Sequence, residues 1–269
     1  MSRKTIAALI LAFWIAGLGL MLRRSFGGDL TRRLAEAAIR VQPATFYYSL
    51  SYRGAKIGAA SSAIDTLVGA VVSEEYYTGR FPSGDSLMAV SARLHSTMTR
   101  GLRLTNISMQ LDRGAEREKM TAFLQGDTTL VVVNRGGSGS RGPLLIGLHG
   151  PLLPPGLVGV ALLAGEQPKT GLSQRFLVFN PTNAKPERRE ARVTSDSLFT
   201  VVDSADQISG GAWQAAHSDT VRAWQLGGNT SGLTIWVDVE GRIVQAGAPN
   251  GLLLMRTAFE LAFEKGRRR

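Results

Sequence analysis

The chain has 269 residues, no cysteine and a formal net charge of +10 at pH 7. The lack of cysteine excludes disulfide bonds, cysteine-ligated zinc, iron–sulfur clusters and cysteine nucleophiles. Hydrophobic residues make up 44% of the chain, which excludes a globally disordered protein, and the length suits one anchor plus one large domain or two small ones.

The first predicted element is an uncharged run over residues 5–22. As a helix it would extend roughly 27 Å, close to the hydrocarbon thickness of a bilayer. The apolar region of a signal peptide is shorter and ends at a cleavage site with small residues, whereas Arg23 and Arg24 follow this run. We therefore expect residues 1–28 to stay as a single-pass transmembrane anchor with basic flanks.

The middle of this anchor carries a tryptophan beside small residues. Trp14 lies away from the headgroup level that suits an indole, and Gly17 and Gly19 follow it. Small residues let a second helix or a flat, pigment-like ligand approach closely, and the pattern predicts other integral membrane subunits as partners.

Basic residues gather on the carboxyl side of the anchor, where Arg23, Arg24, Arg32 and Arg33 would lie near headgroup level. The lipid bilayer is therefore an expected partner. Aromatic residues are not interleaved with basic ones as in RNA-binding motifs, so we expect no nucleic-acid partner.

Residues 29–43, DLTRRLAEAAIRVQP, are expected to form a short amphipathic helix or linker, with Asp29 as its cap and Pro43 ending it. One face collects the apolar residues Leu30, Leu34, Ala37, Ala38 and Val41. Two interpretations stay open. The helix either lies on lipid headgroups or packs against the following domain.

Residues 44–269 have the pattern of an extramembrane β domain with a basic tail. Runs of strand length recur about every dozen residues, and their connections are too short for helical crossovers, so we expect an antiparallel sheet. Residues 154–165, PPGLVGVALLAG, predict a short buried helix across its concave face. A hairpin turn is expected at Glu240 and Gly241, and residues 252–265 form either a last strand or a closing helix.

Two passages carry a family resemblance, YYSLSYRGAKIGAASSAI and WVDVEGRIVQAGAPNGLLLMRTAFELA. They resemble the first and last hairpins of bacterial envelope domains with a lipoprotein-carrier-like β half-barrel, families of unknown function that also occur ahead of transglutaminase-like modules. The resemblance implies a curved antiparallel sheet that can hold an apolar ligand. It also implies an inner-membrane protein with a periplasmic domain, whereas the count of arginines after the anchor favours a cytoplasmic one.

The residues that could carry chemistry are scattered. His95, His149 and His217 have no metal-ligand spacing, and the loop over residues 136–143 lacks the ending of a phosphate-binding loop. We interpret Glu74–Glu75, Asp203 and Asp206 as solvated carboxylates where strands meet turns. We therefore expect no enzyme activity, no catalytic or metal site and no cofactor.

Three tryptophans, Trp213, Trp224 and Trp236, fall in the last quarter of the chain. They either pack in the core of the closing hairpins or form a docking patch for a partner. Together with the anchor, this predicts a non-enzymatic accessory or structural subunit of a larger bacterial membrane complex, of respiratory, photosynthetic or translocation type. The alternative is a carrier or sensor of an apolar small molecule such as a lipid, with the half-barrel cavity as its site.

Overall fold

The computed structural model describes residues 30–83, 86–136, 142–163, 167–228 and 232–264. The predicted anchor lies outside these residues, and so do five of the expected contact residues, Trp14, Gly17, Gly19, Arg23 and Arg24. In the described part of the chain, no helix combines the length and the apolar character needed to cross a membrane.

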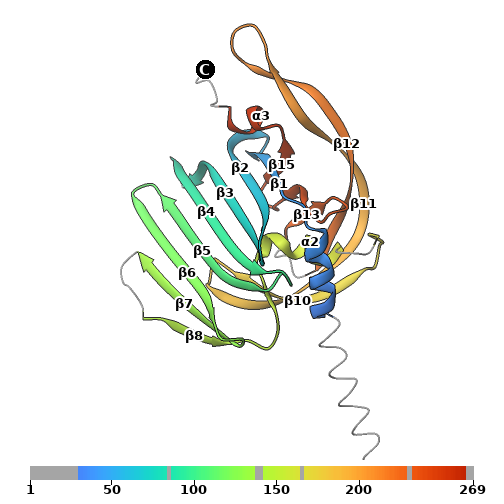
Figure 1. Cartoon of the computed structure of the whole chain (residues 1–269). Helices are drawn as coiled ribbons and strands as arrows, with labels where there is room; N and C mark the ends of the chain where they lie inside the picture. The colour runs from blue at the N-terminus through green and yellow to red at the C-terminus, as the bar shows by residue number, and fades with distance from the viewer. Residues whose placement is uncertain (1–29, 84–85, 137–141, 164–166, 229–231, 265–269) are drawn as a thin grey trace, which may run out of the picture.

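The described chain folds around one curved sheet of fifteen strands (Figure 1). The first eight are β1 (Ala44–Tyr52), β2 (Ala55–Leu67), β3 (Ala70–Ser83), β4 (Ser86–Thr99), β5 (Leu104–Arg113), β6 (Glu116–Gln125), β7 (Thr129–Gly136) and β8 (Leu144–Gly147). The others are β9 (Leu152–Leu153), β10 (Ser173–Asn180), β11 (Lys185–Gln207), β12 (Trp213–Gly228), β13 (Thr234–Val237), β14 (Ile243–Gly247) and β15 (Leu252–Thr257). The expected mainly β class is confirmed.

Two meanders make up this sheet, and they join where β1 pairs with β15. Neighbouring strands are antiparallel throughout except for β9 and β10, which are parallel. The two edge strands, β8 and β9, are separated only by residues 148–151, a connection that spans at most roughly 18 Å. The edges of the sheet therefore lie near each other, and the sheet curves around one interior.

Period-two alternation decides which side chains face that interior. In β4, Leu94, Ser96 and Met98 are buried, while His95 between them and Arg93 before them are exposed. The strands are therefore half-buried, as their sequence pattern predicts, and His95 lies at the surface.

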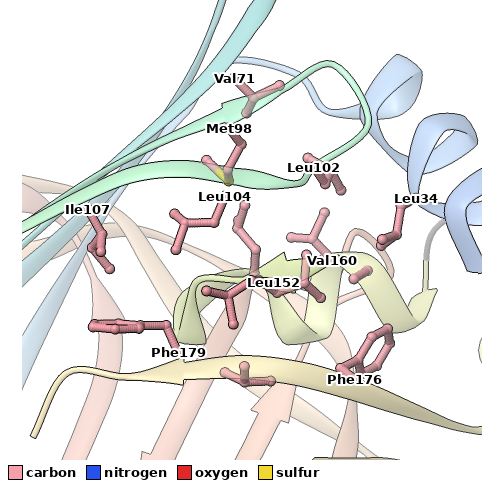
Figure 2. Packing of buried hydrophobic residues seen from close by; sticks show 14 of the residues in the cluster. Leu34, Val71, Met98, Leu102, Leu104, Ile107, Leu152, Val160, Phe176 and Phe179 are labelled. Atoms are coloured by element: carbon pink, nitrogen blue, oxygen red, sulfur yellow. The ribbon is translucent and has the colours of Figure 1, made fainter. Parts of the chain in front are cut away.

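A short helical segment fills the concave side of the sheet, as its apolar sequence predicts. It consists of the 3-10 turn η1 (Pro155–Leu157) and the helix α2 (Val158–Leu163), in which all residues from Gly159 to Leu163 are buried. Figure 2 shows Leu152 and Val160 between Met98 and Leu104 on one side and Phe176 of β10 on the other.

The first helix of the described chain covers residues 30–40. Leu34, Ala37 and Ala38 on its apolar face are buried in the same core as α2. This face is therefore buried in the protein and is not available to a membrane surface. Of the two interpretations, packing against the following domain is the one that describes the helix. Arg32 is exposed and pairs with Glu36 at 3.8 Å, and Arg33 is half-buried.

The carboxyl-terminal segment contains both elements that the sequence left open, the strand β15 and then the helix α3 (Phe259–Phe263). Tyr47 of β1 meets the rings of Phe259 and Phe263 at 5.0 and 6.1 Å between centroids. Lys56 donates to the carbonyl of Leu261 at the end of α3, which places a positive charge at the helix C-terminus. These contacts hold α3 against β1 and β2.

β11 and β12 extend beyond the rest of the sheet as a two-stranded ribbon (Figure 1). β10 pairs only with the start of β11, and β13 pairs only with residues 224–226 of β12, so the distal parts pair with each other alone. The base of the ribbon carries a small second apolar cluster around Val201 and Ala223. Beyond it, most side chains are exposed.

Candidate functional site

A pocket of about 480 Å³ opens between the first helix, α2 and the turn that joins β13 to β14. This volume lies within the range of small-molecule sites in proteins. Its inner wall is apolar and consists of Ala37, Val41, Ile64, Val160 and Leu163. Its polar lining consists of Arg40, Gln42, Gln167, Glu240 and Arg242.

Two large apolar side chains lie exposed on the wall of this pocket. Ile39, from the first helix, is 83% exposed, and Val239, from the β13–β14 turn, is 58% exposed. Exposed aliphatic side chains on either side of an apolar hollow are typical of a surface that a ligand or partner covers.

Arg242 is the buried charge of the pocket, with 6% of its surface exposed. Its Nε lies 2.9 Å from a carboxylate oxygen of Glu240, and its Nη2 donates to the carbonyl of Gln42, which ties the β13–β14 turn to the segment between the first helix and β1. Its Nη1 is buried and has no hydrogen-bond partner among the described residues. A buried donor without a partner is rare in native structures, so this atom marks a place where a ligand oxygen or a water would be stabilised.

The turn that carries Arg242 is fixed by a buried ion pair. Oδ1 of Asp238 accepts hydrogen bonds from the backbone N–H groups of Glu240 and Arg242, at 3.1 and 2.9 Å. Its other oxygen accepts from Nη2 of Arg256 at 2.9 Å. Arg256 also donates to the carbonyl of Ile243, so β15 holds both ends of the turn in place.

An aromatic ring lies beneath both arginines. The guanidinium carbons of Arg242 and Arg256 lie 5.1 and 4.2 Å from the ring centroid of Phe46 in β1. Cation–π contacts of this kind strengthen when water is excluded. Together with the ion pairs they leave the Arg242 side chain little freedom to reorient.

A small cavity of about 30 Å³, room for roughly one water molecule, adjoins this cluster. Arg242 and Phe46 line it, together with Tyr48, Glu75 and Tyr77. Tyr77 donates to a carboxylate oxygen of Glu75 at 2.9 Å. Burial raises the pKa of Glu75 above its ordinary value, which favours the protonated form of the carboxyl group.

The expectation of a solvated Glu75 is therefore wrong. Glu74 points outward and pairs with Arg93 at 3.4 Å, whereas the period of the strand turns Glu75 inward beneath η1. A Cβ at Gly156 of η1 would lie 2.0 Å from a carboxylate oxygen of Glu75, so any larger residue there would require the carboxylate to move.

The three tryptophans expected to pack or dock do not gather at one place. Trp224 packs on the main core and lies 5.7 Å from the guanidinium carbon of Arg222. Trp236 packs on the second cluster, with its ring 5.1 Å from that of Phe199. Trp213, half-buried, lies at the distal end of the ribbon. A shared docking patch of all three is excluded, and contact of any one with a partner stays a prediction.

The ribbon brings together one group of possible metal ligands that spacing along the chain did not reveal. Asp203, His217 and Asp219 each place one ligand atom within 4.8 Å of the others, and all three are exposed. Nδ1 of His217 lies 3.2 Å from Asp203. The group arises from the cross-strand register of β11 and β12, which no local pattern encodes.

The comparisons with known proteins bear on the fold alone. No protein-family model and no curated protein matches the sequence. Among solved structures, the chain is similar to a β-barrel-like protein of Brucella abortus that belongs to a domain family of unknown function, DUF1849. The match has a TM-score of 0.51 at 10% identity and covers 81% of this chain and 96% of the other. The barrel-like fold of the expected resemblance is confirmed, and its bacterial-envelope, lipoprotein-carrier and transglutaminase parts stay predictions.

Proposed function

We propose that this chain is a non-enzymatic binding protein that holds a small amphiphilic molecule between its first helix and its curved sheet. The pocket of about 480 Å³ carries this proposal, because it combines a buried apolar wall with the exposed side chains of Ile39 and Val239. Covering such surfaces removes apolar area from water, which is the main driving force for binding an alkyl chain.

The place of this site differs from the half-barrel cavity expected for a carrier. The concave side of the sheet is filled by α2 and by the apolar face of the first helix. The pocket lies instead at the rim of that interior, beside the first helix. A ligand could therefore enter it without unpacking the core.

The lining supports binding without catalysis. Its polar side chains are arginines, glutamines and a glutamate, and the residues described around it offer no hydroxyl, thiol or imidazole nucleophile. Acyl and phosphoryl transfer usually rely on such a nucleophile, or on a bound metal, placed beside a base. A pocket of this composition can hold a molecule and exclude water from its alkyl part.

Photo-crosslinking tests the proposal. The full chain, in lipid nanodiscs, is exposed to a decanol that carries a diazirine in its alkyl chain, and the labelled peptides are identified by mass spectrometry. We expect labels on residues 37–42 and 239–242, reduced severalfold by Ile39→Asp combined with Val239→Asp. The control is Leu198→Asp, because Leu198 is an aliphatic residue 66% exposed on the ribbon. Labels that are spread evenly, or unchanged by the double substitution, would overturn the proposal.

A second candidate is the accessory subunit of a membrane complex, anchored in the inner membrane with its β domain in the periplasm. The observation that favours it is the β11–β12 ribbon, whose distal part projects past the sheet and exposes most of its side chains. Extraction in mild detergent, followed by size analysis and mass spectrometry, tests it. A stoichiometric membrane assembly that dissociates when the ribbon is shortened supports this role, and a lone monomer contradicts it.

A further inference from the structure

We propose that the molecule bound in the pocket carries an anionic group and that Nη1 of Arg242 donates a hydrogen bond to one of its oxygens. This inference rests on the proposed binding function and adds the chemical class of the ligand. The class is a single alkyl chain that ends in a carboxylate or a phosphate.

The bonding of Arg242 carries the first step. Arginine stays charged at all physiological pH values and offers five N–H donors. Here Nε faces Glu240 and Nη2 donates to Gln42, both of which line the pocket, while Nη1 is buried without a partner among the described residues. An acceptor that reaches Nη1 would complete the set, and an anionic oxygen forms the stronger, charge-assisted bond.

The charges around the pocket point the same way. Arg40 and Arg242 line it with two positive charges, and Glu240 is the single acidic residue among the described lining residues. About half of the Glu240 side chain is exposed, so water screens part of its attraction for Arg242. Asp238, the nearby buried carboxylate, is engaged by Arg256. The pocket therefore keeps an excess positive charge, which favours an anionic ligand.

The rigidity of Arg242 adds a third reason. Asp238 fixes the backbone of the turn, and the ring of Phe46 lies beneath the guanidinium group at 5.1 Å. A donor that is already oriented loses little conformational freedom when a ligand binds, so more of the interaction appears as affinity. The apolar wall beside it would cover the alkyl chain of the same molecule.

A water molecule in the small adjoining cavity is the competing partner for Nη1, since Arg242 lines that cavity too. A water molecule and a ligand oxygen, as alternative partners of Nη1, lead to different ligand preferences. If water satisfies Nη1, an alkyl alcohol and the corresponding alkyl carboxylate would bind about equally. If the ligand satisfies it, the carboxylate binds more tightly.

Competition against the diazirine decanol measures this preference at pH 8 with decanoate, decyl phosphate and unlabelled decanol, and with the full chain in nanodiscs. We expect decanoate or decyl phosphate to displace the probe about tenfold more effectively than decanol does. The better of the two shows which anionic group the site takes. Equal displacement by all three in the unchanged protein overturns the inference while leaving the binding function intact, whereas no specific labelling at all removes both.

Substitutions then assign the preference to one residue. Arg242→Gln should abolish the preference for the anion while decanol still competes, and Arg242→Lys should retain part of it. Arg40→Gln is the matched control, because Arg40 is an exposed arginine that lines the same pocket. A preference that disappears with Arg40→Gln and survives Arg242→Gln contradicts the assignment. If Arg242→Gln fails to fold, the comparison of ligands on the unchanged protein still decides the inference.

Discussion

Gly159 of α2 and Gly241 of the β13–β14 turn meet backbone to backbone. A Cβ at Gly159 would lie 2.3 Å from the carbonyl oxygen of Gly241, and a Cβ at Gly241 would lie 2.3 Å from the carbonyl carbon of Gly159. Gly241 also has a φ of +79°, which glycine adopts without strain. This contact sets the distance between the buried helix and the turn that carries Arg242.

Gly159→Ala should therefore destabilise the protein, although alanine normally favours a helix. The added methyl group has to displace backbone, and overpacking of this kind costs about 2–3 kcal/mol. Chemical denaturation measures the free energy of unfolding. Gly147→Ala is the control, since Gly147 is exposed in β8 with no atom within 4 Å of a Cβ there, and it should change stability by less than about 0.5 kcal/mol. An equal effect of both substitutions would show that the contact is not tight.

The sequence predicted those parts of the fold that depend on local pattern. The hairpin turn at Glu240 and Gly241, the strands before it and the buried apolar helix all follow from alternation, glycine placement and composition. The pairing of β1 with β15 joins segments about two hundred residues apart, and no local pattern encodes it. Its consequence, the joining of two meanders into one sheet, became visible only in the structure.

The candidate site was missed for a related reason. The small cavity beside it is lined from β3 by polar side chains, Glu75 and Tyr77, which period-two hydrophobicity does not reveal. Arg256 lies in an apolar run, and Arg242 follows a glycine turn, a position typical of exposed arginine. A charged residue inside an otherwise apolar strand was the one available signal, because such a residue is buried only with a partner.

The ion pair of Asp238 and Arg256 yields a second prediction. The two side chains are 12% and 9% exposed, so neutralising one leaves the other charged and buried. Asp238→Asn should lower the free energy of unfolding by about 3 kcal/mol. The matched control is Asp196→Asn, whose partner Arg222 lies 2.7 Å away on the exposed ribbon and whose loss should cost less than about 1 kcal/mol. Urea denaturation compares the two, and equal losses would contradict the prediction.

The distal ribbon should contribute little to stability. Val202 pairs with Ser218, and beyond this pair most side chains are exposed. Replacing residues 203–217 by Asn-Gly, a good two-residue hairpin turn, should change the free energy of unfolding by less than about 1 kcal/mol. Thermal denaturation followed by circular dichroism measures it. A much larger loss would mean that the ribbon is part of the folding core and not a projecting arm.

The buried carboxyl group of Glu75 makes stability depend on pH. Its pKa is raised above the ordinary value of a glutamate, mainly by burial, so between the two pKa values the folded protein binds more protons than the unfolded chain. The resulting stabilisation is present in full below the unfolded pKa of about 4.3 and is lost as the pH rises through the folded pKa. Glu75→Gln removes this titration. Relative to the variant, the unchanged protein should therefore become less stable as the pH rises above the unfolded pKa of about 4.3.

Urea denaturation at one-unit steps from pH 4 to pH 8 measures the difference. Glu74→Gln is the control, because Glu74 is the preceding residue of the same strand and has half of its side chain exposed. Its difference from the unchanged protein should stay constant within about 0.5 kcal/mol, since an exposed pair contributes little. A difference for Glu75→Gln that is equally flat would show that this carboxyl group titrates alike in the folded and unfolded chains. Because the Glu75 carboxyl group is buried beneath Gly156 and accepts a hydrogen bond from Tyr77, we expect the stability difference for Glu75→Gln to change with pH.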